Sequence, residues 1–222
     1  MAAQRRLNRD ELIATALAVA DADGLGALTV RRVAQRHDVT PMALYRHFPD
    51  KDGLLDAVAE RLLADVRIPP PDGRPWHDQL RDLLTETLTA LRPHPNATML
   101  LFTRILGCEP GLDLTERVLA LLTDAGLSTE QGAETSCQVL SSLVTLVMTE
   151  PGRLHAPDPE AQEAAVRAKR ASLLALSPRR HPHVVAAADA LADCASEEAY
   201  FRRGIELIVT GVRGVRPEPA GV

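Results

Sequence analysis

Residues 28–48 read LTVRRVAQRHDVTPMALYRHF, and this stretch decides the predicted fold. Thr29 is a favourable N-cap for a short helix that would run to about Arg36, and Thr40 followed by Pro41 supplies the N-cap and first-turn proline of a second helix. Only about four residues separate the two predicted helices, so the chain must turn sharply between them. The stretch therefore predicts a helix-turn-helix.

The second helix of this motif, from Pro41 to His47, is predicted to bury one side only. Five apolar residues are spaced to close a small core, namely Val33, Ala34, Val39, Leu44 and Phe48. The outward side chains would be those of Thr40, Met42, Ala43, Tyr45, Arg46 and His47. A short helix fits the major groove of DNA, which is about 12 Å wide, and an arginine beside an aromatic ring and an imidazole suits phosphate and base-edge contacts.

Helices are also predicted on both sides of the motif. Before it, Asn8 can cap a helix with Glu11 as its capping-box partner, and Asp23-Gly24 ends that helix. After it, Asp50 caps a fourth helix over about 50–66. Three helices and a connecting fourth would therefore form one small unit.

The clearest domain boundary lies at residues 69–75, which hold four prolines and a glycine. We therefore predict a helix-turn-helix DNA-binding domain over 1–66 and a second, larger domain over 67–222. No stretch shows the two-residue alternation of strands, so the predicted fold class is all-α. In the second domain, helices are expected at roughly 75–92, 96–107, 112–125, 128–149, 158–176, 182–194 and 196–214.

Charge becomes informative only when it is counted locally. Over the whole chain a net charge of −5, with 25% charged residues, indicates no particular partner. Residues 25–51 contain five basic and two acidic side chains. Positive charge is thus concentrated in the helix-turn-helix, as contact with DNA phosphates requires.

Cysteine spacing and hydropathy indicate where the protein works. Cys108, Cys137 and Cys194 are far apart and odd in number, which fits neither a disulfide framework nor a paired metal site. The longest charge-free, apolar-rich run, Thr135–Thr149, is shorter than the roughly 20 residues of a membrane span. No signal-peptide pattern follows Met1. We expect a cytoplasmic protein without membrane contact.

The motif resembles the N-terminal DNA-binding signature of the tetracycline repressor (TetR) family of bacterial transcription regulators. The similarity rests on residues 28–34, 39–48, Lys51 and Leu54-Leu55, and the rest of the chain matches only in helix count, length and rough pattern. Two positions depart from the usual signature: Asp38 stands where glycine is common in the turn, and Gly53 replaces a frequent acid, so weaker capping is expected there.

The resemblance implies a set of DNA-binding residues, which are Thr29, Arg31, Thr40, Pro41, Met42, Ala43, Tyr45, Arg46, His47 and Lys51. The N-terminus of the helix after Thr29 would hold a phosphate, as helix N-termini favour, and Lys51 would hold another. Arg31 would reach a base edge. A palindromic operator is the implied DNA partner, and repression the implied activity.

By the same resemblance, the second domain would enclose a small-molecule effector pocket, and binding there would shift the fourth helix and weaken operator affinity. The candidate lining is Leu62, Leu84, Met99, Leu100, Phe102, Thr103, Cys137, Ser141, Thr145 and Met148. The tetracycline repressors hold the magnesium of their drug with a histidine on the sixth helix. Between Pro95 and Leu106 this sequence has none, so no metal or cofactor is expected.

Dimerisation is expected because one helix-turn-helix touches too little DNA for tight, specific binding. The predicted homodimer interface uses about 128–149 and 196–214. A candidate contact stripe on the last helix comprises Phe201, Gly204, Ile208, Gly211 and Val215. A second stripe would face the subunit's own core and comprises Ile205, Val209 and Val212.

Two other classes of protein remain open at this point. The same helices would suit an effector-independent DNA-architectural or protein-interaction module. An all-α enzyme would require a catalytic constellation, but the sequence contains no GxGxxG, Walker, HExxH or GxSxG motif. His181 and His183 flank Pro182 and do not share a helical face. We therefore expect a regulator and not an enzyme.

Overall fold

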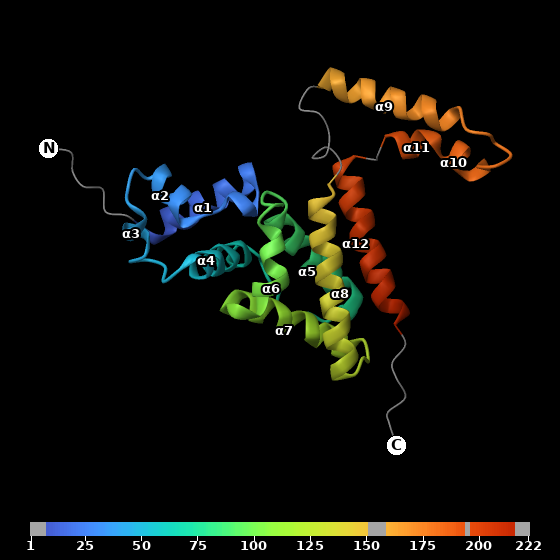
Figure 1. Cartoon of the computed structure of the whole chain (residues 1–222). Coiled ribbons are helices and arrows are strands. Elements are labelled where there is room, and N and C mark those ends of the chain that lie inside the picture. The colour runs from blue at the N-terminus through green and yellow to red at the C-terminus, as the bar shows by residue number, and fades with distance from the viewer. Residues whose placement is uncertain (1–7, 151–158, 194–195, 216–222) are drawn as a thin grey trace. The chain divides into compact units, whose positions relative to one another are not determined.

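The computed structural model describes residues 8–150, 159–193 and 196–215, and every regular element in these ranges is helical (Figure 1). The chain divides into two compact units. The first includes the chain up to Met148 and again from Leu207 onward, and the second runs from Thr149 to Glu206. None of the helices in the described ranges is long and apolar enough to span a bilayer.

The predicted helix-turn-helix is present at the N-terminal end. Its elements are α1 (Arg9–Asp23), the short 3₁₀ helix η1 (Leu25–Ala27), α2 (Val30–Arg36), α3 (Pro41–Leu44) and α4 (Lys51–Ala64). Three of the four N-caps predicted for this motif form, because the side chains of Asn8, Thr29 and Asp50 each accept a hydrogen bond from a nearby backbone amide at 2.8–3.1 Å. The helix boundaries therefore follow the local capping chemistry.

Helix α4 connects this motif to the rest of the first unit. It contacts α1 within the motif and also packs against α5 (Trp76–Leu91) and α7 (Glu109–Asp124). Its side chains at Leu54, Val58 and Leu62 are almost fully buried, as a helix covered by neighbours on one side requires. A displacement of α4 would therefore disturb two sets of contacts together.

The predicted helix over 96–107 is wrong in detail, because three short elements replace it. They are η2 (Thr98–Leu100), α6 (Leu101–Arg104) and η3 (Ile105–Gly107). At the start, the hydroxyl of the fully buried Thr98 donates to backbone carbonyls of the preceding turn, which favours 3₁₀ geometry. At the end, α7 begins at Glu109, three residues earlier than expected, with Pro110 in its first turn.

The remaining helices differ less from prediction. The first unit also contains α8 (Thr129–Met148), and α12 (Glu197–Gly214) begins in the second unit and ends in the first. The second unit contains α9 (Pro159–Leu174), α10 (Pro182–Ala186) and α11 (Ala188–Ala192). One helix over 182–194 was expected. The backbone at Ala187 leaves helical geometry, and α11 then packs on α9, where Arg170 pairs with Asp189 at 2.6 Å.

The proline-rich boundary loop is held in place by one buried amide. Gln79 is 8% exposed, and its Nε2 donates to the carbonyls of Asp72 and Arg74 at 3.1 and 2.6 Å. Its Oε1 accepts from Arg117 Nη2 of α7 at 2.6 Å. A buried amide that lost these hydrogen bonds would be left without a partner or water, which is energetically costly. The bonds of Gln79 therefore fix the path of the loop between α4 and α5.

The start of α7 lies unusually close to η3. A Cβ atom added at Gly111 would stand 1.8 Å from the carbonyl oxygen of Ile105. Only glycine fits there without a backbone shift. Gly132 in α8 offers the contrast, since a Cβ there would meet Leu119 at 3.8 Å, an ordinary van der Waals contact.

We therefore expect Gly111→Ala to destabilise the protein by about 2 kcal/mol or more, as overpacking against fixed backbone does. Gly132→Ala is the matched control and should stabilise by up to about 1 kcal/mol, because alanine is the better helix former. Chemical denaturation followed by circular dichroism measures both. Equal stability of the two variants would contradict the close approach of α7 and η3.

Candidate nucleic-acid interface and effector cavity

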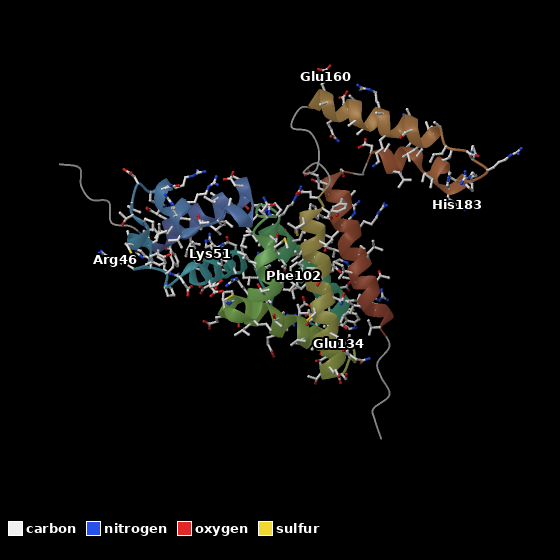
Figure 2. All side chains as sticks on the ribbon, viewed as in Figure 1. Arg46, Lys51, Phe102, Glu134, Glu160 and His183 are labelled. Carbon is white, nitrogen blue, oxygen red and sulfur yellow. The ribbon has the colours of Figure 1, made fainter. Side chains whose placement is uncertain are left out.

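The helix that begins at Pro41 buries one side and exposes the other, as predicted. Leu44 is fully buried and Phe48 is 2% exposed, whereas Met42 is 70% and Tyr45 46% exposed. Arg46 is exposed as well and projects at the outer end of the motif (Figure 2). The helix is short, but its turns continue to Phe48, whose amide donates to the carbonyl of Leu44 at 3.0 Å.

Four predicted details of the motif differ in the structure. Ala43, His47 and Val39 are half-buried, so the first two are less exposed and the third less covered than expected. Thr40 occupies the N-cap position, but its side chain makes no capping hydrogen bond. Its exposed hydroxyl thus has no role in starting the helix and is accessible to an external partner.

The turn between α2 and α3 is closed by an aspartate in the left-handed region. Asp38 has φ 54°, and the amide of Val39 donates back to the carbonyl of Ala34 at 3.1 Å. Aspartate adopts this conformation more readily than most residues, so it can replace the glycine of the usual signature. His37 Nε2 lies 2.8 Å from Thr15 Oγ1, which attaches the turn to α1.

Cations on this face divide into paired and unpaired ones. Arg32 forms an ion pair with Asp23 at 2.6 Å, which directs its guanidinium toward α1. Arg31, Arg46 and Lys51 are exposed and form no ion pair with any residue that the structure describes. These three charges are thus available to an anionic partner.

The N-terminus of α4 presents Lys51 at its first position, where the helix dipole also favours an anion. The cap forms despite Gly53, since the carboxylate of Asp50 accepts from the Gly53 amide at 2.8 Å. A Cβ at Gly53 would come within 2.8 Å of the Pro49 ring, so any side chain there would require a local shift. Lys51 is labelled on α4 in Figure 2.

Arg104, the last residue of α6, binds α4 one residue beyond Lys51. Its Nη2 donates to the Asp52 carboxylate at 2.8 Å, and its Nη1 donates to the carboxylate of Asp56. Burial lowers the pKa of Arg104, but the hydrogen bonds that it donates to Asp56 and Asp52, with the charges of those two acids, outweigh burial and raise the pKa above its ordinary value. The guanidinium therefore remains charged and neutralises two acids beside Lys51.

A partly open cavity lies among α5, η3, α7 and α8 and encloses about 600 Å³ including the part open to solvent. Nine of its thirteen lining residues are leucine, isoleucine or valine. The others are Thr87, Thr115, Ser136 and Cys137. A partly open space with so apolar a lining and a few polar groups is of the kind that takes a small organic molecule.

Of the predicted pocket residues, only Leu84 and Cys137 line this cavity. Leu62 and Leu100 are buried in the core instead. Ser141 is half-buried, and the remaining five are exposed, namely Met99, Phe102, Thr103, Thr145 and Met148. Phe102 is labelled on α6 in Figure 2. The short, broken segment around α6 presents a different face from the continuous helix assumed in the prediction.

The predicted stripes on α12 are divided differently in the structure. Ile205, Val209 and Val212 are buried, as expected for a side facing the chain's own core. Phe201 and Gly204 are buried with them, so their assignment to an outer contact surface is wrong. The exposed face of the last turns carries Leu207, which is 69% exposed, and the two glycines at 211 and 214.

The described residues hold no group of three or more histidine, cysteine or acidic side chains that could bind a metal ion. Cys108 and Cys137 are free thiols. Burial, joined by the charges of Glu60 and Asp56, raises the pKa of the Cys108 thiol, so its reactive thiolate is scarce.

These features define a helix-turn-helix protein with a separate, apolar cavity. The family model described as "Bacterial regulatory proteins, tetR family" matches residues 12–58, and the model described as "Tetracyclin repressor-like, C-terminal domain" matches residues 69–216. The chain therefore belongs to the tetR family, whose members are DNA-binding transcriptional regulators and not enzymes.

Individual members of the family are similar to this chain over most of its length. An HTH-type transcriptional regulator of Saccharopolyspora erythraea is 28% identical over 206 residues, covering 93% of this chain and 84% of that protein. The class C tetracycline repressor of Escherichia coli is 27% identical over 213 residues, covering 95% and 93%. The structure of Streptomyces coelicolor ActR in complex with actinorhodin is 25% identical with a TM-score of 0.76, covering 94% and 99%.

Sequence reasoning missed the polar residues that link elements. Arg104 and its partners Asp52 and Asp56 are about fifty residues apart, and charges on surface helices gave no reason to pair them. Thr87 and Thr115 were overlooked as cavity residues. Thr87 lies one helical turn after the buried Leu83 and Leu84, and Thr115 lies one turn before the buried Val118. Their position on the buried faces of α5 and α7 is the signal that would have found them.

Proposed function

We propose that this protein represses transcription by binding a palindromic operator as a homodimer and leaves the operator when a small molecule fills the cavity. Residues 1–66 would read the DNA, and residues 67–222 would hold the effector and form the dimer. The operator lies on bacterial DNA, so the protein would act in the cytoplasm. One observation carries the proposal: Arg31, Arg46 and Lys51 are exposed and form no ion pair with a described residue, in the same motif in which Leu44 and Phe48 are buried and α3 exposes its other side.

The proposed contacts follow from this arrangement. Tyr45, Arg46 and Met42, on the exposed side of α3, would enter the major groove of the DNA. The N-termini of α2 and α4, with Thr29 and Lys51, would each hold a phosphate. Arg31 would reach a base edge from the first turn of α2.

The first test is a gel shift with DNA flanking the protein's own coding region, repeated over a metabolite library. Specific binding that a small molecule abolishes supports the proposal. Specific binding that no cavity ligand weakens would favour an effector-independent architectural protein. Absence of any sequence preference would contradict the assignment of α3 as the reading helix.

Two substitutions separate phosphate contacts from base contacts. Lys51→Ala should weaken binding to all sequences alike and reduce the slope of log affinity against log salt by about one. Arg31→Ala should cost about 1–3 kcal/mol and relax preference at one base pair. Fluorescence anisotropy over a salt series with operator variants measures both effects.

Arg61→Ala is the control for these substitutions, because Arg61 lies near the other end of α4 and already pairs with Asp65. It should leave affinity and salt slope at the wild-type values. If Lys51→Ala and Arg31→Ala also behave like wild type, the DNA-facing surface lies elsewhere.

The dimer would form on the sides of α8 and α12 that one subunit leaves exposed. Ser142 and Thr145 on α8 and Leu207 on α12 are uncovered in the single chain. Small residues at Gly211 and Gly214 would allow a symmetry-related helix to approach closely. In a twofold-symmetric dimer the same patch of each subunit takes part, so the interface would contain two copies of Leu207.

Leu207→Arg should therefore yield monomers, since each buried leucine contributes about 1.5–3 kcal/mol and a symmetric dimer contains two. Size-exclusion chromatography with light scattering gives the oligomeric state, and operator affinity should fall at least about tenfold. The control is Leu112→Arg on α7, another exposed leucine outside the proposed interface. A Leu207→Arg variant that stays dimeric would reject this interface.

Arg104 would couple the cavity to the DNA-binding motif. Its neighbours Ile105 and Leu106 line the cavity, and its guanidinium binds Asp52 and Asp56 of α4. A ligand that displaces η3 would move this guanidinium relative to α4. Such a ligand changes operator affinity only if it binds the two positions unequally.

We expect Arg104→Gln to weaken operator binding by about three- to tenfold, because two charge-assisted hydrogen bonds are lost and two acids beside Lys51 are left uncompensated. Fluorescence anisotropy with the operator provides the measurement. Arg81→Gln, which removes an arginine paired with Asp78 on α5, should have no effect. Unchanged affinity of the Arg104 variant would show that α4 is positioned without this contact.

A further inference from the structure

The three hydroxyl groups in the cavity wall each donate their hydrogen to a backbone carbonyl of their own helix. Thr87 donates to the carbonyl of Leu83 at 2.7 Å, and Thr115 donates to that of Gly111 at 2.8 Å. Ser136 donates to the carbonyl of Ala133 at 2.7 Å. A hydroxyl that bonds to its own helix in this way retains only acceptor lone pairs for another molecule. The hydroxyls of the cavity therefore offer acceptors and no donors.

The cavity wall also lacks a charge. None of its thirteen residues is acidic, basic or histidine. The nearest arginines along the chain are engaged elsewhere, since Arg104 binds Asp52 and Asp56 and Arg117 Nη2 donates to Gln79. Glu134, labelled on α8 in Figure 2, is exposed and does not line the cavity. An anionic group in this space would lose its water without gaining a cation or a hydroxyl donor.

We infer that the ligand of this cavity is a neutral, largely apolar molecule without a carboxylate, phosphate or sulfonate, whose polar group is a hydrogen-bond donor. Burial of an unpaired anion is far more unfavourable than burial of a neutral group, so the cavity should bind a neutral molecule much more tightly than its anionic counterpart. A donor such as a hydroxyl or a secondary amine would bond to the free lone pairs of Thr87, Thr115 or Ser136. The inference deepens the proposed function, on which its regulatory meaning rests.

Two dyes that share one aromatic skeleton test, on the full-length chain, whether the cavity prefers a neutral ligand to an anionic one. N-phenyl-1-naphthylamine is neutral and carries one N–H donor, and 8-anilinonaphthalene-1-sulfonate adds only a sulfonate. Fluorescence titration should show saturable binding of the neutral dye, with the sulfonate at least tenfold weaker. Equal or tighter binding of the sulfonate, or no binding of the neutral dye, would overturn the inference.

Cys137 reports whether the dye occupies this cavity. Its side chain lines the cavity and remains exposed, so iodoacetamide should modify it. The neutral dye should slow this alkylation at least severalfold, as followed by peptide mass spectrometry. Cys108 lies outside the lining and is the internal comparison, whose rate should not change. Dye binding without protection of Cys137 would place the ligand elsewhere and overturn the inference.

A second pair of compounds tests whether the ligand needs a hydrogen-bond donor. In 1-methoxynaphthalene a methyl group replaces the hydroxyl hydrogen of 1-naphthol, and we expect the naphthol to displace the bound dye at a severalfold lower concentration. Thr115→Val should reduce that preference, and Thr115→Ser should retain it. If the ether competes as well as the naphthol, the ligand does not require a donor. These assays involve no DNA, so their failure leaves operator binding by α3 untouched.

Discussion

Burial of Leu44 and Phe48 is the constraint on which the DNA-binding end of this protein depends. The helix α3 has four residues, and a helix so short has no stability of its own in water. Its orientation comes from two side chains that are 0% and 2% exposed in the core of the motif. Because those side chains point inward, Met42, Tyr45 and Arg46 must point outward.

The same packing constraint extends to the rest of the first unit through α4. This helix contacts α1 within the motif as well as α5 and α7, and Arg104 binds its first two turns. The residues that follow Arg104 line the cavity. The position of the motif and the shape of the cavity are therefore parts of one packing arrangement, and a ligand of the cavity would act on DNA binding by favouring one such arrangement over another.

Much of the fold could be predicted because its signals are local. The caps at Asn8, Thr29 and Asp50, the proline at 41 and the proline-rich boundary each act within a few residues, and all of the predicted helix starts in the motif are present. The segment over 96–107 was harder. Its break into short elements depends on the buried Thr98 and on the contact between Gly111 and Ile105, which the helical periodicity of that segment does not reveal.

The candidate site shows the same division. The sequence by itself determined the all-helical fold and the helix-turn-helix, because capping, turn residues and the spacing of apolar side chains are read from neighbours in the chain. It also indicated the family, through the resemblance of the motif residues to a known signature. Only the tertiary structure decided that Phe201 is buried, that Leu84 and Cys137 line a cavity which eight other candidates do not, and that Arg104 binds α4. Those facts depend on which distant residues become neighbours, and helical periodicity identifies an apolar face without identifying what covers it.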